Sequence, residues 1–358
     1  MFLARLSLYV TQRERAAWLK PDSVDPLHSE IAERLLERFQ ARVAGHAALT
    51  SSCTLCDTSA PGTQDISRPF PRVLVLGGAL DAVAQHLFTS AKGVQAVTFA
   101  DSSPAQLACA ARVVPADQAH KCTYTQLAND DKLPPSMEPG TFDAVVACLG
   151  LHWRNDLPGV LLQCRKALVP DGLLLAALLG GNTLQELRVA CALAEQERQG
   201  GLSARVSPLA QVRDAGDLLG RAGLALPTVD VDTLTARYPS PADAVTHLRV
   251  LGESNACINR RKGPLSRDTA LAAAAAMIAY SGKLAPGAAH DEEDDGETEE
   301  PTPLPAAVSE VCMTFQVVYM AGWSPDSSQP SAKRRGSATA SLADLAAQLG
   351  NDGGAARG

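Results

Sequence analysis

Residues 73–83 read VLVLGGALDAV, an apolar run that breaks at two glycines and passes straight into helix-like spacing. This order is typical of a buried parallel strand that leads into a nucleotide-binding turn and a helix. The glycines then stop, because Ala79 and Asp81 stand where a loop around a nucleoside normally keeps small, flexible residues. The stretch therefore predicts a Rossmann-like strand and turn with a reduced capacity to hold a cofactor.

Four further apolar segments follow, and helix-like patterns separate several of them. The expected strands are 72–76, 96–100, 124–127, 142–149 and 173–179. The expected helices are 82–90, a segment that opens at Pro104, and 158–168. Strands that alternate with helices in this way predict an α/β fold built on a doubly wound, mostly parallel sheet. Ligands bind beyond the carboxyl ends of the strands in such a sheet, so we expect the site at that edge.

The chain divides further by composition. The expected segments are a helical lead-in (1–46), an inserted flexible loop (47–70), the core (71–181), a helical lobe (182–281), an acidic disordered insertion (282–306), a strand that returns to the core (307–323) and a polar tail (324–358). A Thr-x-x-Glu pattern from Thr183 to Glu186 predicts a capping box at the start of the lobe.

Charge and cysteine usage exclude some classes of protein. The formal net charge is −7, and the run DEEDDGETEE at 291–300 accounts for it, so the remainder is near neutral. Without clustered Lys and Arg we expect no nucleic-acid partner, and no apolar stretch reaches the length of a membrane span. Nine cysteines scattered through apolar segments indicate reduced thiols. The CTLC pair at 53–56 has no second pair at zinc-ligand spacing.

Polar residues follow the second and third expected strands. Asp101, with Ser102 beside it, stands about 20 residues after the glycine turn, from where a carboxylate binds the ribose hydroxyls of a nucleoside. The alternative is a cap for the helix that opens at Pro104. Asn129 and Asp130 follow the third strand, where a polar side chain either contacts an adenine amino group or lies in a solvated loop.

The segment HWRND at 152–156 lies just beyond the fourth strand. Such a dense group of polar and aromatic side chains at this end of a core strand is typical of a functional loop. In the structural alternative, Trp153 fills the core and Asp156 caps the helix that begins near Pro158. His152 and Asp156 supply two metal ligands without an HxD or HExxH element, so we expect no metal site.

Several long segments resemble the mitochondrial complex I assembly factor 5 family. They include FDAVVACLGLHWRNDLPGVL, LVPDGLLLAALLGGNTLQELRVACALAEQERQGGLSARVSP and LGESNACINR, and the similarity covers nearly the whole chain apart from the two insertions. The resemblance implies a class I S-adenosylmethionine-dependent methyltransferase fold and an arginine hydroxylase of a complex I core subunit.

The resemblance also implies roles for individual residues. The cofactor-binding candidates are Gly77, Gly78, Asp101, Ser102, Asn129, Asp130 and Leu149. Binding of S-adenosylmethionine is expected to be weak or lost, because Ala79 and Asp81 add side chains at the turn and Asp81 would repel the methionine carboxylate. For a peptide arginine as substrate, the catalytic candidates are Asp156 as guanidinium anchor, His152 as positioning or proton-transfer group and Trp153 as stacking wall.

Three functions follow from these observations. The first is hydroxylation of an arginine near the quinone site of complex I, although the sequence shows no iron-binding triad or flavin site. The second is a non-catalytic assembly chaperone, which the altered glycine turn favours. The third is a methyltransferase resembling malonyl carrier-protein methyltransferases, which the LGESN segment disfavours.

The resemblance further implies partners and a location. The expected partners are the core subunit that carries the target arginine and a small assembly factor. The expected location is the mitochondrial matrix, peripheral to the inner membrane, although the first residues show no evident presequence.

Overall fold

The computed structural model describes residues 23–43, 70–90, 93–134, 137–257, 260–261, 263, 265–283 and 310–329. The chain divides into two compact units, Met1–Pro325 and Asp326–Gly358, and the fold below belongs to the first. The lead-in before residue 23, the inserted loop with its Cys53 and Cys56, nearly all of the acidic insertion, and most of the tail lie outside the described residues.

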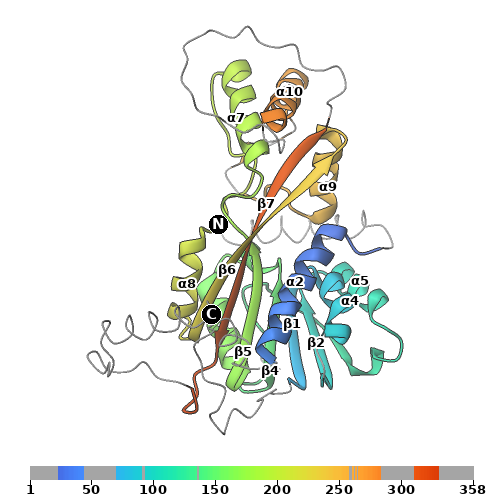
Figure 1. Ribbon diagram of the computed structural model, residues 1–358, viewed down its shortest axis with the longest axis vertical. Helices are drawn as coiled ribbons and strands as arrows, with labels where there is room; N and C mark the ends of the chain where they lie inside the picture. The colour runs from blue at the N-terminus through green and yellow to red at the C-terminus, as the bar shows by residue number, and fades with distance from the viewer. Residues whose placement is uncertain are drawn as a thin grey trace, which may run out of the picture. The chain divides into compact units, whose positions relative to one another are not determined.

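A seven-stranded sheet forms the centre of the first unit (Figure 1). In sheet order the strands are β3 (Cys122–Gln126), β2 (Ala96–Asp101), β1 (Arg72–Gly78), β4 (Phe142–Cys148), β5 (Leu168–Leu179), β7 (Val311–Trp323) and β6 (Ala225–Tyr238). The first five strands are parallel, and β7 pairs antiparallel with both β5 and β6. The prediction of a doubly wound, mostly parallel sheet is confirmed.

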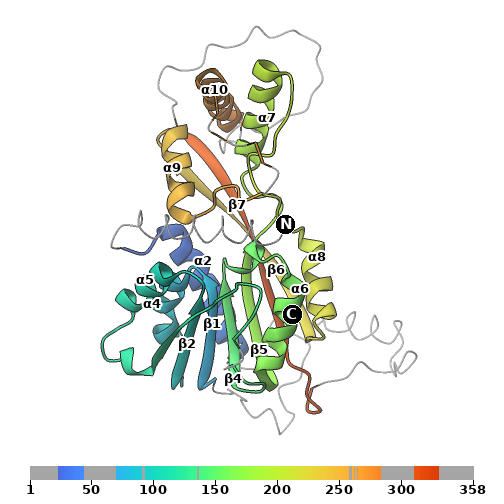
Figure 2. The ribbon, with the colours of Figure 1, turned by 180° about the vertical axis from the view of Figure 1, so that it is seen from behind.

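Helices cover both faces of this sheet. The helices are α2 (Pro26–Val43), α4 (Leu80–Ser90), α5 (Pro104–Val113), α6 (Leu157–Ala167), α7 (Gln185–Gln199), α8 (Val212–Arg221), α9 (Pro241–Leu251) and α10 (Arg267–Lys283). Because side chains alternate along a strand, Val73 and Val75 join one core cluster with α2, α4 and α5, whereas Leu74 and Leu76 join another with α6 and α8. Figures 1 and 2 show these two layers from opposite sides.

Complete burial explains the uninterrupted apolar runs of the central strands. All seven residues of β4 are buried, as expected for a strand that is covered on both faces. Among the five parallel strands, the positions agree with the sequence to within two residues except at β5, which begins at Leu168 rather than 173. Its pairing with β4 shifts register between Leu168 and Leu173, so this first part is irregular.

The prediction of a wholly helical lobe over 182–281 is wrong. This segment also supplies β6, whose 14 residues extend the sheet beyond β7. The signal was the alternation VDVDTLT at 229–235, which is typical of a strand with one covered face. Beyond the sheet, α7 packs against α10 through Cys191, Ala194 and Ala273.

The predicted capping box is also wrong. α7 begins at Gln185, and the residue at its cap is Leu184 in a left-handed conformation. Thr183 Oγ1 donates to the Gln316 carbonyl at 3.1 Å, and the Glu186 carboxylate accepts from the Thr314 backbone N–H at 3.1 Å. Both side chains therefore bind β7 rather than each other, and they fasten the returning strand to the start of α7.

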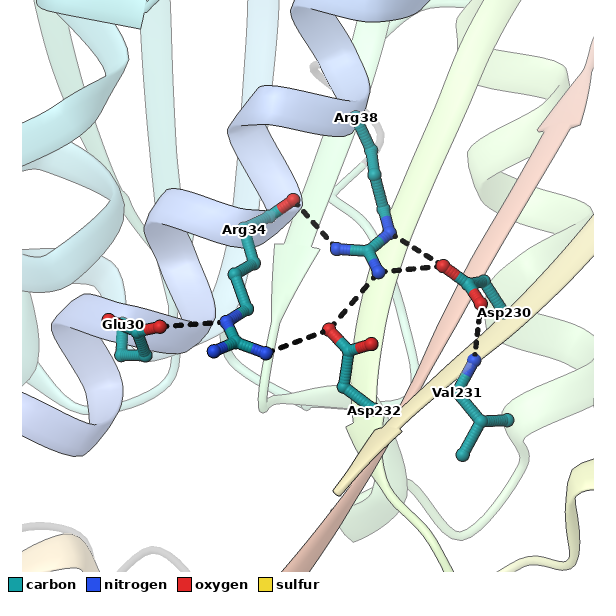
Figure 3. Close-up of polar contacts among 6 residues, drawn as sticks. All are labelled: Glu30, Arg34, Arg38, Asp230, Val231 and Asp232. Atoms are coloured by element: carbon teal, nitrogen blue, oxygen red, sulfur yellow. Dashed lines mark hydrogen bonds and ion pairs between the residues drawn. The ribbon is translucent and has the colours of Figure 1, made fainter. Parts of the chain in front are cut away.

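An ion-pair network joins α2 to β6 (Figure 3). Arg38 Nη2 lies 2.6 Å from Asp230 Oδ2 and 3.1 Å from Asp232 Oδ2, and Arg34 Nη1 lies 3.3 Å from Asp232 Oδ2. The Arg38 guanidinium also lies 3.9 Å from the centre of the Tyr319 ring, a cation–π contact. The hydrogen bond from Arg38 lowers the pKa of Asp230, and the network holds α2 across the sheet.

Candidate functional site

The glycine turn after β1 packs directly against the end of β4. Gly77 and Gly78 both have positive φ, +62° and +76°, which a residue with a side chain adopts at a cost. A Cβ on Gly78 would lie 1.9 Å from the Cys148 carbonyl oxygen, and the Ala79 N–H donates to the same oxygen at 2.9 Å. Backbone packing therefore requires Gly78 whether or not a ligand binds, and the positive φ of Gly77 favours glycine there.

The arginine of the HWRND segment lies over this turn. A Cβ on Gly77 would lie 2.8 Å from Arg154 Nη2 and 3.8 Å from Asp101 Oδ2. Arg154 Nη1 donates to Asp130 Oδ1 at 2.9 Å, and both side chains are 1% exposed. The guanidinium therefore lies between the glycine turn and the predicted adenine-side residue, with Asp101 close by.

The predicted cofactor acids are held by the chain itself. Ser102 Oγ donates to Asp130 Oδ2 at 2.9 Å, so both Asp130 oxygens have protein donors. Asp101 is fully buried, and its Oδ1 accepts from the Ser103 N–H at 2.7 Å. The cap of α5 is Ser103, so Asp101 supports the capping residue and does not cap the helix itself.

The remaining cofactor candidates have structural contacts. Asn129 Oδ1 accepts from the Asp131 N–H at 2.8 Å and closes a local turn. Leu149 is buried with φ +56°, and its N–H donates to Ala177. A Cβ on the neighbouring Gly150 would lie 2.9 Å from the Gly77 backbone, so the two loops touch.

The residues as arranged do not fit S-adenosylmethionine. The turn keeps its positive-φ glycines, but Arg154 occupies the approach to Gly77 and takes one oxygen of Asp130. A nucleoside between Asp101 and Asp130 would have to displace this buried guanidinium. Cys148 lies against Gly78 of the turn. Burial is the main cause, and the charge of Asp81 a smaller one, that raises the pKa of its thiol, so this thiol stays protonated.

A second group of polar residues gathers at Glu253, in the turn after α9. His152 Nε2 lies 3.1 Å from Glu253 Oε1, and Trp153 Nε1 donates to the same oxygen at 3.4 Å. The His152 side chain is 1% exposed and that of Glu253 is 9% exposed. A carboxylate accepts hydrogen bonds, so Nε2 of His152 carries a proton. The buried Nδ1 makes no hydrogen bond to a described residue.

Asp156 stands apart from this group in its contacts. Its Oδ1 accepts from the Gly159 N–H at 3.0 Å, and it is the exposed N-cap of α6. Trp153 is buried and packs against Ala256. The structural alternatives for Asp156 and Trp153 are thus both observed, and the catalytic roles of His152, Trp153 and Asp156 stay predictions.

Comparisons with known proteins agree with this fold. A family model described as a methyltransferase domain matches residues 76–174. The mitochondrial arginine-hydroxylase NDUFAF5 of Danio rerio is 38% identical over 281 residues, which are 78% of this chain and 77% of the relative. The chain belongs to the NDUFAF5 family.

More distant proteins also match this member of the NDUFAF5 family. A malonyl-[acyl-carrier protein] O-methyltransferase of Halorhodospira halophila is 30% identical over 245 residues, which are 68% of this chain and 71% of that protein. The crystal structure of a putative methyltransferase from Bacillus halodurans covers 78% of this chain and 98% of its own at 13% identity, with a TM-score of 0.46.

Two residues of this NDUFAF5-family site were missed by sequence reasoning. Arg154 lay inside the quoted HWRND segment, but its buried pairing with Asp130 joins positions 24 residues apart. Glu253 lay inside the LGESN stretch, 101 residues after His152. Neither the Arg154–Asp130 contact nor the His152–Glu253 contact has a local sequence pattern. The available signal for both residues was that the HWRND and LGESN stretches belong to the segments that resemble the family.

The described parts of the chain contain no group of three or more metal-ligating side chains. Within the same ranges, no helix is both long and apolar enough to cross a membrane.

Proposed function

We propose that this chain hydroxylates an arginine side chain of a partner protein and that the Glu253 group binds the guanidinium. The observation that carries the proposal is the convergence of His152 and Trp153 on one oxygen of a nearly buried carboxylate. The relatives at 38–39% identity are named arginine-hydroxylases, which supports the same activity here.

The second oxygen of Glu253 is the binding point for the substrate. Among the described residues, both hydrogen bonds to the Glu253 carboxylate end on Oε1, from His152 and Trp153, which leaves Oε2 for a ligand. A guanidinium is planar and always charged, and it donates strongly to a carboxylate. Trp153 offers a ring beside that carboxylate, so a stacked guanidinium would be held on two sides.

Replacing a C–H bond by C–OH is a two-electron oxidation of the substrate and requires an oxygen-atom donor. With dioxygen, one atom enters the product and the other leaves as water with two electrons and two protons from a reductant. The residues described here bind and orient the substrate, and Nδ1 of His152 is placed to accept a proton, because its other nitrogen is committed to Glu253.

The partner, cofactor and location belong to the same proposal. The substrate would be a complex I core subunit, with a small assembly factor as a second partner. The zebrafish and human relatives are named as mitochondrial proteins, which supports a mitochondrial location for this chain. We propose that this chain works in the matrix beside the inner membrane. S-adenosylmethionine, if it binds, would do so weakly and with Arg154 withdrawn from Gly77.

A second function, a non-catalytic assembly chaperone, is favoured by one observation. The buried Arg154–Asp130 pair commits both side chains to each other beside the glycine turn, as expected where ligand binding is no longer needed. The two functions differ in whether the partner's arginine gains an oxygen atom.

The test is complementation of cells that lack the protein, with mass spectrometry of the partner subunit. Glu253→Gln keeps the size of the side chain and removes its charge, so we expect at least ten-fold less hydroxylated arginine. Asp156→Asn retains the capping oxygen and serves as the matched control, with less than about two-fold change. Full hydroxylation in Glu253→Gln would contradict the proposed anchor, and loss in Asp156→Asn alone would return that role to Asp156.

If unmodified arginine accompanies normal complex I assembly in wild-type cells, the chaperone function stands and the hydroxylase function is wrong.

A further inference from the structure

A cavity lies among α7, α9, α10 and the segment that follows Asn255. Its volume is about 680 Å³, within the range of roughly 300–1,000 Å³ that is typical of small-molecule sites. Neither the glycine turn nor Glu253 lines it. Apolar side chains form much of its wall, including Leu187, Cys191, Val245, Leu265, Ala274 and Met277.

Arginines supply the charge among the described residues of the lining. Arg205, Arg249, Arg260 and Arg261 line the cavity, and no described aspartate or glutamate does. Arg205 is neutralised by Glu195, with Nε and Oε1 2.6 Å apart.

The other three guanidiniums keep their charge. Among the described residues, Arg249, Arg260 and Arg261 form no ion pair. Arg260 donates to the Cys257 carbonyl at 3.1 Å and Arg261 to the Gln199 side chain, and both acceptors are uncharged. Three cations thus border an apolar wall, and no carboxylate of a described residue balances them.

We infer that this cavity binds an amphipathic anion, a molecule with an apolar chain and a carboxylate or phosphate head. The apolar wall removes the chain from water, and the unneutralised guanidiniums donate to the head. The same charges repel a substrate arginine, so this site is distinct from the one proposed at Glu253. The inference does not depend on hydroxylase activity.

The test uses a fluorescent polyunsaturated fatty acid, cis-parinaric acid, and its methyl ester with the purified full chain. We expect the acid to bind with one site per chain and the ester at least about ten-fold more weakly, because the ester has lost the charge that the arginines bind. Competition then separates the sources of the head group. Stronger displacement by oleate indicates a carboxylate ligand, and stronger displacement by lysophosphatidate indicates a phosphate; either result agrees with the inference.

Variants locate the site. Arg249→Gln should weaken binding of the acid about ten-fold and leave the ester unchanged, whereas Ala274→Phe should weaken both by filling the wall. Arg213→Gln, on α8 and with a side chain 86% exposed, is the matched control and should change neither.

A second variant, Arg260→Gln with Arg261→Gln, covers the case in which Arg249→Gln does not fold. Equal affinity for acid and ester would overturn the inference, as would wild-type affinity in both arginine variants or in Ala274→Phe. Tighter binding of the peptide DEEDDGETEE than of the acid would overturn the amphipathic character of the ligand.

Discussion

Replacing Arg154 by methionine removes one half of a buried ion pair and leaves the other half charged. Asp130 would keep Ser102 as a donor, and its side chain is 1% exposed. Breaking such a pair costs about 3–5 kcal/mol, which lowers the melting temperature by roughly 6–20 °C for a domain of this size. The same change at Arg198, whose pair with Glu197 is 52% and 64% exposed, should cost less than about 1 kcal/mol.

The assays are urea unfolding, followed by circular dichroism, and calorimetric titration with S-adenosylmethionine. The double variant Arg154→Met/Asp130→Asn should recover much of the lost stability, because neither member of the pair then carries a charge. Arg154→Met alone should bind S-adenosylmethionine at least ten-fold more tightly, since the ligand no longer displaces a guanidinium. A stability loss below about 1 kcal/mol, or an unchanged affinity, would refute the reasoning.

Restoring glycine at Ala79 and Asp81 should tighten that affinity less than Arg154→Met does, because it leaves the guanidinium in place. Gly78→Ala should destabilise the protein by at least about 2 kcal/mol more than Gly140→Ala. Both glycines have positive φ, but a Cβ at Gly78 meets the Cys148 carbonyl oxygen at 1.9 Å, whereas a Cβ at Gly140 has open space. Equal losses of stability in urea unfolding would contradict this prediction. For Asp25, burial raises the pKa, but the hydrogen bond from His247 and the charges of His28 and His247 outweigh it and lower the pKa to about 2. A carboxyl whose pKa is lowered by folding stabilises the fold at any pH above the ordinary carboxyl pKa, and this stability is lost as the pH falls. The difference in unfolding free energy between wild type and Asp25→Asn should therefore close as the pH falls from about 4 to about 2. A difference that does not change with pH would contradict this prediction.

The sheet was predictable because its signals are local. The run VLVL before the glycines and the run VVAC of β4 each fall within one buried strand, and continuous burial leaves a continuous apolar pattern. β6 was predicted as helix, although its alternation was visible, because it was read as part of a lobe that does contain four helices.

The site was less predictable because its contacts join distant segments. Asp156 was chosen as anchor for its nearness to His152 in sequence, yet its carboxylate caps α6 while Glu253, about 100 residues on, meets the imidazole. Thr183 and Glu186 had the spacing of a capping box, but a returning strand took both side chains. A local pattern of this kind predicts which residue types can form hydrogen bonds. It does not predict their partners, because tertiary packing decides which distant residues come within reach.

The position of β7 sets the order in which a newly made chain completes its sheet. β7 lies between β5 and β6 and pairs with both of them. Until residue 323 has left the ribosome, β5 and β6 therefore each have an unpaired edge. At roughly 5–20 residues per second, the interval after Tyr238 lasts about 4–17 s. During this time the edge of β5, with residues 173–179 almost fully apolar, is open to pairing with other chains. A chain cut short before Val311 would keep that edge permanently, and its fate is aggregation or degradation rather than a smaller working protein.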